Sequence, residues 1–313
     1  CIRCFYILEY RRRKREEITM RKPLFTGSGV AVITPFTSET VDYAALRRLI
    51  DFQLQSGTDA IVVCGTTGEA ATMSYVERMR TVETVVRQVD GRVPVIAGTG
   101  ANSTETAITL SKDAALAGVD GLLVVTPFYN KATQRGLIRH YETIADAVDR
   151  PMILYNVPSR TGVKCAAETY AALSRHPNIQ GVKEASGDFA LIQKTRELCP
   201  EDFYIWSGND DETAPIMLLG GVGVISVAAN VAPREMRALT HACLEGDFVT
   251  AGKLQLKLRR LCEALFWEVN PIPVKTALAM MGRCEERLRL PLCEMEPGNR
   301  ERLRGVLAEY GLV

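Results

Sequence analysis

The sequence holds 313 residues, 47% of them hydrophobic, and a chain of this length and composition can bury a large core. It is long for an ordinary single domain, although barrels of alternating strands and helices reach this length as one unit. Its formal net charge of +1 argues against a surface that binds nucleic acid or an anionic membrane.

The first 22 residues are strongly basic, because they contain eight Lys or Arg residues and only three Glu residues. The run Arg11-Arg12-Arg13-Lys14-Arg15 is compatible with nucleic-acid binding or with a transit peptide, but the glutamates and the lack of serine argue against transit. No apolar stretch here is long enough for a signal peptide or a membrane span. We therefore expect residues 1–22 to be a non-core extension, disordered or an artefact of upstream translation.

The nine cysteines are unevenly spaced and do not suggest a disulfide framework, which favours a reducing, cytoplasmic location. Cys1 and Cys4 form a lone CxxC pair without the second pair that a zinc site needs. The three histidines (His140, His176 and His241) are far apart in the sequence. We therefore expect no metal site.

From Gly29 onward, short β-rich runs alternate with helix-like segments in which apolar residues recur at i, i+3 and i+4. This alternation is typical of βα units and a parallel sheet. The clearest helix-like segments are 42–55, 75–89, 103–117 and 134–148. The strand candidates are 30–34, 60–64, 93–97, 121–126, 152–156, 179–184, 203–207 and 222–227.

Eight such units in succession favour a closed barrel over an open doubly wound sheet. An open sheet would usually carry a G-x-G-x-x-G turn after its first strand, whereas this chain has Thr34-Pro35-Phe36-Thr37 there. Residues beyond the eighth unit show helix-like segments and no strand period. The sequence thus predicts an α/β protein, a (β/α)8 TIM barrel at residues 23–232 with a C-terminal helical extension at 233–313.

The strand at 179–184 carries Lys183 near its C-terminal end, where barrels concentrate function. On strict alternation Ile179, Gly181 and Lys183 share a face, and Gly181 leaves room beside the lysine. A primary amine in an apolar cavity favours its neutral form and becomes a nucleophile towards carbonyls. On this stretch alone, a lysine that simply reaches solvent at a strand end is the alternative.

Other strand ends also carry polar groups. The turn Gly65-Thr66-Thr67-Gly68-Glu69 offers hydroxyls and backbone N–H groups that could cradle a carboxylate, or it is only a tight turn with a cap. Thr126-Pro127-Phe128-Tyr129-Asn130 follows the fourth strand, and Tyr155-Asn156-Val157-Pro158-Ser159-Arg160-Thr161-Gly162 follows the fifth. Each tyrosine taken singly could fill the core, but hydroxyls, an arginine and a lysine on neighbouring strand ends indicate a site.

These motifs, together with Gly181-Val182-Lys183-Glu184-Ala185, resemble the dihydrodipicolinate synthase family over about residues 25–313. That family lies within the pyruvate-dependent Schiff-base aldolases, which also include N-acetylneuraminate lyase. The resemblance implies a lyase that condenses pyruvate with L-aspartate 4-semialdehyde in the diaminopimelate route to lysine. The covalent imine between Lys183 and pyruvate would serve in place of a cofactor.

The resemblance also implies roles for single residues. Tyr155, Thr66 and Tyr129 correspond to a proton relay in which Tyr129 reaches in from a neighbouring subunit, so we expect a homo-oligomer, a dimer of dimers. Thr66 and Thr67 would bind the carboxylate of pyruvate, and Gly208 and Ile225 would line its pocket through backbone groups. Arg160 would hold the carboxylate of the semialdehyde, since its planar fork binds carboxylates bidentately.

Lysine-inhibited members of the family bind their end product in a cleft between subunits. The enterobacterial type carries an acidic residue at the position of Thr106, and without it the ammonium group of lysine lacks a buried partner. Arg78 adds a like charge, although Glu105 could partly compensate. We therefore expect weak or absent feedback at these vestigial positions. They are Ala70, Ala71, Tyr75, Arg78, Asn102, Thr106 and Phe128.

Two alternatives remain open at this point. The first is another pyruvate-dependent aldolase or lyase of the same superfamily, against which Arg160 counts when the acceptor is a neutral sugar. The second is a barrel that binds keto acids or lysine as a sensor without turnover, against which the intact relay positions count.

Overall fold

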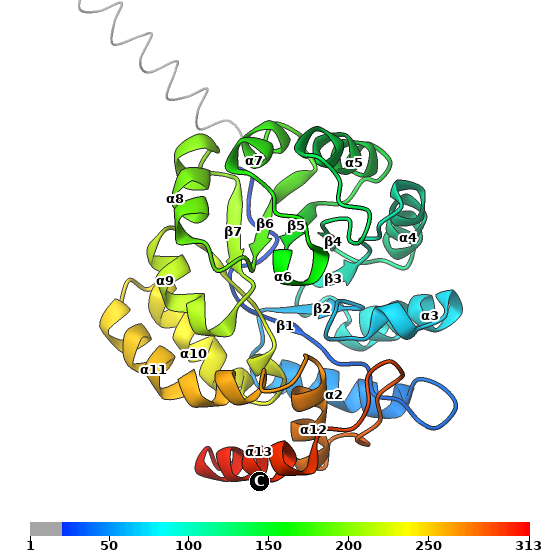
Figure 1. Cartoon of the computed structure of the whole chain (residues 1–313), viewed down its shortest axis with the longest axis vertical. Coiled ribbons are helices and arrows are strands. Elements are labelled where there is room, and N and C mark those ends of the chain that lie inside the picture. Colours follow the sequence, from blue (N-terminus) through cyan, green and yellow to red (C-terminus); the bar gives the residue numbers. More distant parts are fainter. Residues whose placement is uncertain (1–20) are drawn as a thin grey trace, which may run out of the picture.

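The computed structural model describes residues 21–313 and shows a closed barrel of eight parallel strands in chain order, with β1 paired to β8. Helices surround the barrel on its outside (Figure 1). This confirms the predicted (β/α)8 barrel. The strands are β1 (Gly27–Ala31), β2 (Ala60–Val63), β3 (Val95–Gly98), β4 (Gly121–Val125), β5 (Met152–Asn156), β6 (Ile179–Glu184), β7 (Tyr204–Ser207) and β8 (Gly223–Ser226).

The helices begin at caps that the sequence supplies. The Asp42 side chain accepts from the N–H groups of Ala44 and Ala45, and Ser74 forms a capping box with Glu77. The helices are α2 (Tyr43–Gln55), α3 (Tyr75–Val89), α4 (Thr104–Leu116), α5 (Gln134–Asp146), α6 (Pro158–Thr161), α7 (Ala167–Leu173), α8 (Phe189–Leu198), α9 (Thr213–Leu218), α10 (Pro233–Leu244), α11 (Phe248–Ala264), α12 (Ile272–Met280) and α13 (Pro297–Glu309). Short 3-10 turns are η1 (Ala70–Thr72), η2 (Asp210–Glu212) and η3 (Ala228–Asn230).

The first strand lies three residues earlier than predicted. Residues 32–34 are buried and apolar enough to look like a strand, but the Ile33 N–H donates to the side-chain oxygen of Asn230 rather than to a neighbouring strand. The Thr34 hydroxyl likewise donates to the carbonyl of Gly68, at 2.7 Å. Only the Val32 N–H still donates to β2, at the Val62 carbonyl, 3.0 Å away. Burial beyond that last ladder hydrogen bond explains the error.

The prediction that Ile179 shares a face with Lys183 is wrong. Met152 pairs with Ile179 but Ile153 pairs with Gly181, so the register shifts by one residue at the start of β6. Ile179 packs in the cluster between barrel and helices, whereas Lys183 lies over the ring of Tyr155, which belongs to the interior cluster. A Cβ on Gly181 would lie 1.9 Å from the Tyr204 carbonyl oxygen, so this glycine allows β7 to approach closely.

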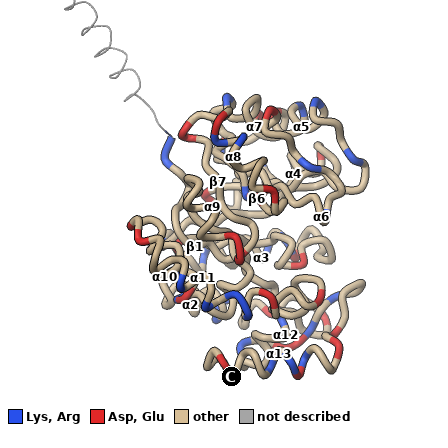
Figure 2. Tube along the Cα trace, turned by 60° about the vertical axis from the view of Figure 1, so that its left-hand side comes forward, with Lys and Arg blue, Asp and Glu red and all other residues tan. Residues whose placement is uncertain are grey.

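The C-terminal helices extend the barrel. Helix α10, which the predicted boundary assigns to the extension, packs against β1 and β8 and serves as the eighth barrel helix. Helices α11, α12 and α13 continue from it (Figure 1). In Figure 2 basic and acidic residues are interspersed along the described chain. Within residues 21–313, no helix has both the length and the apolar character needed to cross a membrane.

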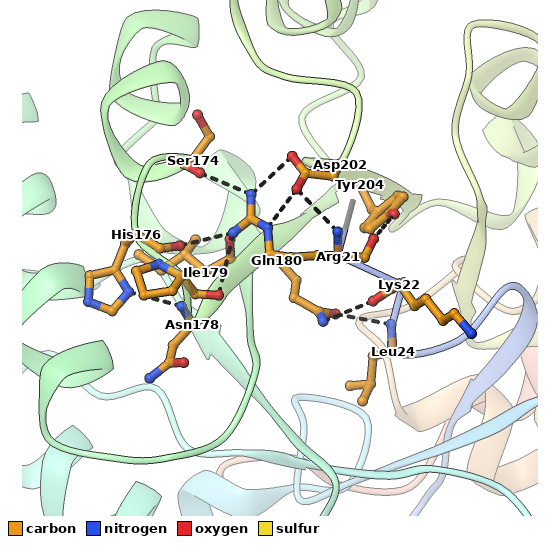
Figure 3. Close-up of polar contacts among 11 residues, drawn as sticks. Arg21, Lys22, Leu24, Ser174, His176, Asn178, Ile179, Gln180, Asp202 and Tyr204 are labelled. Carbon is orange, nitrogen blue, oxygen red and sulfur yellow. Dashed lines mark hydrogen bonds and ion pairs between the residues drawn. The ribbon is translucent and has the colours of Figure 1, made fainter. Parts of the chain in front are cut away.

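Arg21 anchors the start of the described chain at the N-terminal end of the barrel (Figure 3). Its guanidinium group makes a bidentate pair with Asp202, at 2.9 and 3.2 Å. It also donates to the backbone carbonyls of Ser174, His176 and Ile179 at 2.9 to 3.0 Å. Arg21 and Lys22 lie within the predicted extension of residues 1–22, yet both contact the barrel; residues 1–20 of that prediction lie outside the described residues.

We predict that Arg21→Ala lowers the free energy of unfolding by on the order of 2 kcal/mol, because several charge-assisted hydrogen bonds are lost together. Thermal unfolding measures this, with Lys22→Ala as the matched control, since the Lys22 side chain is exposed. Equal midpoints for the two variants would show that the Arg21 contacts contribute nothing to stability.

Candidate active site

A cavity of about 720 Å³ lies at the C-terminal ends of the barrel strands. The turn after β2, the end of β5, helix α6, strand β6 and the end of β7 all contribute to its wall. The structure therefore brings together six of the residues that the sequence predicted: Thr66, Thr67, Tyr155, Arg160, Lys183 and Gly208.

Lys183 reaches this cavity from β6 and is only 5% exposed. Burial lowers the pKa of its ammonium group to about 8; the Asp210 carboxylate opposes the shift and the Arg160 guanidinium adds to it. The Lys183 nitrogen lies 4.4 Å from the centroid of the Tyr155 ring. A lysine of this kind holds an appreciable neutral fraction near neutral pH and can attack a carbonyl carbon.

Tyr155 is the neighbour of Lys183 across the β5–β6 ladder. Burial raises the pKa of its hydroxyl, and the Arg160 guanidinium and the Thr66 hydroxyl partly offset this rise. The phenol is therefore protonated at neutral pH, as a proton donor must be. The backbone carbonyl of Tyr155 accepts from the Thr126 hydroxyl at 2.9 Å, which fixes the end of β5.

Glu184 holds the ends of β5 and β6 together from the outer side. Its carboxylate accepts from the Asn156 amide at 2.9 and 3.2 Å, from the Tyr170 hydroxyl at 2.9 Å and from the Ser186 N–H at 2.9 Å. Burial raises the pKa of this carboxyl, and the Ser186, Tyr170 and Asn156 donors oppose the rise. The network positions the strand end that carries Lys183.

The C-terminal extension supplies one wall of the cavity, which the sequence analysis missed. The side-chain amide of Asn270 donates to the Thr67 hydroxyl at 3.0 Å, and Arg160 donates to the Asn270 carbonyl at 3.2 Å. One residue thus contacts both predicted carboxylate-binding groups. The other lining residues that were not predicted are Val157, Ser159, Ala185, Asn209, Val227, Phe266, Trp267, Glu268 and Val269.

A buried ion pair fixes the same extension to the turn after β2. Lys275 of α12 binds Glu69, and both side chains are almost completely inaccessible. Lys275 also donates to the Arg287 carbonyl at 2.8 Å, and Glu69 accepts from the Arg289 N–H at 3.2 Å. Because breaking one side of such a pair leaves a buried charge, the extension and the turn are held in one arrangement.

Two predicted site residues do not line the cavity. Tyr129 is 89% exposed, with its backbone in the left-handed region. Ile225 is fully buried in the interior cluster. Nothing in the described chain brings the Tyr129 side chain to the cavity of its own subunit.

The seven predicted effector positions also lie outside this cavity. The Arg78 guanidinium donates to the Gly98 carbonyl at 2.5 Å, and the Tyr75 hydroxyl donates to Asp113 at 2.7 Å. Asn102 accepts from the Asn130 amide through its carbonyl at 2.9 Å. Thr106 is exposed in the first turn of α4, and Phe128 is 39% exposed; Ala70 and Ala71 belong to η1. Within residues 21–313, no group of three His, Cys, Asp or Glu side chains could hold a metal ion.

Fold and site together define a (β/α)8 barrel with a buried lysine of lowered pKa near the end of its sixth strand. The chain belongs to the Dihydrodipicolinate synthetase family, whose model matches residues 24–310. It is 52% identical over 290 residues to a 4-hydroxy-tetrahydrodipicolinate synthase of Geobacter sulfurreducens. The alignment covers 93% of this chain and all of that protein.

Two solved structures show the same likeness. The dihydrodipicolinate synthase of Aquifex aeolicus is 49% identical, with a TM-score of 0.91 over 92% of this chain and 99% of that one. The chloride-inhibited dihydrodipicolinate synthase of Acinetobacter baumannii, solved in complex with pyruvate, is 43% identical. Its TM-score is 0.90, and the match covers 92% of this chain and 99% of that chain.

Proposed function

We propose that the chain is a lyase that condenses pyruvate with L-aspartate 4-semialdehyde, the reaction of the 4-hydroxy-tetrahydrodipicolinate synthases. The observation that carries this proposal is Lys183, a buried amine of lowered pKa in a cavity with Tyr155 and Arg160. The close relatives of this name and the pyruvate complex of a similar barrel support it.

The first half of the reaction activates pyruvate. Thr66 and Thr67 bind its carboxylate, which places the ketone carbon near the Lys183 amine. The amine adds to this carbon, and loss of water leaves an imine whose nitrogen withdraws electrons from the methyl group. Tyr155 donates the proton that the leaving oxygen needs, and the Thr66 hydroxyl exchanges protons with Tyr155.

The second half joins the two substrates. Loss of a methyl proton turns the imine into an enamine, whose carbon attacks the aldehyde of the semialdehyde. Arg160 holds the carboxylate of this second substrate, and the Asn270 carbonyl in turn holds Arg160. Attack of the substrate's own amino group on the imine closes the ring and releases Lys183.

The direct test incubates the purified protein with both substrates, without added metal or nucleotide. We expect turnover by the wild type and by Lys194→Ala, whose lysine is exposed, and none by Lys183→Ala. Borohydride with pyruvate should trap the wild type at Lys183. Full activity of Lys183→Ala would refute the mechanism.

Arg160→Ala should raise the KM for the semialdehyde by about 10²-fold, equivalent to about 3 kcal/mol, because the substrate carboxylate loses its charged partner. Trapping by pyruvate alone should persist. Steady-state kinetics with each substrate varied in turn separates the two effects, and an equal loss for both substrates would contradict the assigned role.

We also propose that Tyr129 completes the proton relay of a neighbouring subunit in a homo-oligomer, which its 89% exposure supports. Tyr129→Phe should lower turnover by roughly 10²–10⁴-fold. Mixing it with Lys183→Ala subunits should restore about a quarter of the wild-type activity, because each mixed dimer gains one intact site. Full activity of Tyr129→Phe would place Tyr129 outside the relay, and mixed samples that stay at the level of the separate variants would contradict its action in a neighbouring subunit.

Feedback by lysine should be weak or absent. Arg78 and Tyr75 are already bound to groups of their own subunit, and Thr106 offers no charge to an incoming ammonium group. Initial rates with increasing lysine measure this, and a sharp fall at sub-millimolar lysine would contradict it.

A further inference from the structure

Asp210 is a buried carboxylate beside the cavity that the proposed mechanism does not yet use. It is the first residue of η2, directly after the Gly208 and Asn209 that line the cavity. Only 3% of its surface is exposed. A carboxylate removed from water is costly unless a positive charge or several hydrogen bonds compensate it.

The two carboxylate oxygens of Asp210 have different surroundings. Oδ2 accepts from the backbone N–H groups of Val227 and Ala228, at 3.1 and 2.8 Å, just beyond β8. Oδ1 is buried and has no hydrogen-bond partner among the described residues. Thr213 and Gln255 each donate to the Asp210 backbone carbonyl at 2.9 Å, so the residue is firmly held.

Among the groups near the Asp210 carboxylate, Lys183 is the cation that interacts with it. Val227, whose N–H binds Asp210, lines the same cavity as Lys183, and the Gly208 N–H donates to the Glu184 carbonyl at 2.7 Å, beside the strand end that carries Lys183. Burial raises the pKa of the Asp210 carboxyl, and the Ser226 hydroxyl, the Ala228 and Val227 N–H groups and the Lys183 ammonium group oppose this rise. The pKa of the Cys262 thiol, on α11, is raised by burial first and by the Asp210 carboxylate second. Lys183 is the cation that lowers the pKa of Asp210, and Asp210 in turn raises the pKa of Lys183, which makes the two groups electrostatic partners.

The reaction proposed at Lys183 forms a buried positive charge that a nearby carboxylate would stabilise. When the amine adds to a ketone, a C–N bond forms, the C–O bond breaks and the oxygen leaves as water. The nitrogen keeps one proton and carries a positive charge in the resulting iminium ion. Burial in the cavity disfavours this charge as it disfavours the ammonium ion, and only the charged iminium draws electrons strongly from the methyl group.

We propose that Asp210 is the fixed counter-ion of Lys183, which keeps the imine formed with a keto acid protonated. The proposal rests on the function proposed above and adds a positioning residue to it, because Asp210 acts through Lys183 and does not itself line the cavity. Arg160 lowers the pKa of Lys183 whereas Asp210 raises it, so the two residues have opposite effects on the charge at Lys183.

The test compares Asp210→Asn with Asp211→Asn, whose carboxylate is next in the chain but exposed. Pyruvate and cyanoborohydride, which reduces only the iminium form, trap the adduct at a series of pH values. In the wild type trapping should rise through the pKa of Lys183, about 8, and fall where the iminium loses its proton. Asp210→Asn should move both limbs to lower pH by about one unit, the effect of losing a nearby opposite charge.

Asp211→Asn should leave the profile unchanged, and Arg160→Gln should move the rising limb to higher pH. An unshifted profile in folded Asp210→Asn would overturn the counter-ion role. This assay needs no semialdehyde, so a wild type that traps pyruvate but condenses nothing would refute the proposed acceptor alone.

Thermal unfolding gives a second readout if Asp210→Asn is poorly folded. Removing the lysine as well, in Asp210→Asn/Lys183→Met, should recover stability, because the unpaired buried cation is then gone. Recovery of stability in the double variant would support an interaction between Asp210 and Lys183. If the two substitutions are simply additive, or if the double variant is as poorly folded as Asp210→Asn, the counter-ion role is wrong.

Discussion

The mechanism proposed for this barrel depends on keeping the amine of Lys183 out of water. Lys183 is nearly inaccessible, and burial accounts for most of the fall in its pKa to about 8. A buried amine is useful only if its nitrogen stays in one place. The Glu184 network fixes the strand end behind it, and the interior cluster packs beneath Tyr155.

The side of the cavity that we propose binds the substrates depends on a second long-range constraint. Thr67 and Arg160 come from different βα loops, and both contact Asn270 of the C-terminal extension. The Lys275–Glu69 pair fixes this extension to the turn that contains Thr67. Helices that the barrel itself does not require therefore set the geometry of the site.

The barrel and six of the residues that line the cavity could be predicted from the sequence, because strand periodicity places residues at strand ends and a closed barrel brings those ends together. Thr66, Tyr155, Arg160 and Lys183 were found in this way. The register shift that turns Ile179 outward leaves no mark in the local pattern, since it depends on pairing with β5.

Asn270 and Arg21 were missed for a related reason. Asn270 belongs to a segment without strand period, and Arg21 contacts groups more than 150 residues away. Such contacts exist only once the chain has folded. Local periodicity carries no information about them.

The contacts of Arg21 have a practical consequence for protein engineering. This residue fixes the start of the described chain beside the N-terminal ends of β6 and β7, whereas residues 266–270 near the other end of the chain form part of the wall of the cavity at the C-terminal ends of the strands. An affinity tag or fusion partner joined upstream of Arg21 therefore starts on the side away from the substrates. Shortening the C-terminal helices would instead disturb the elements that hold the cavity wall in place.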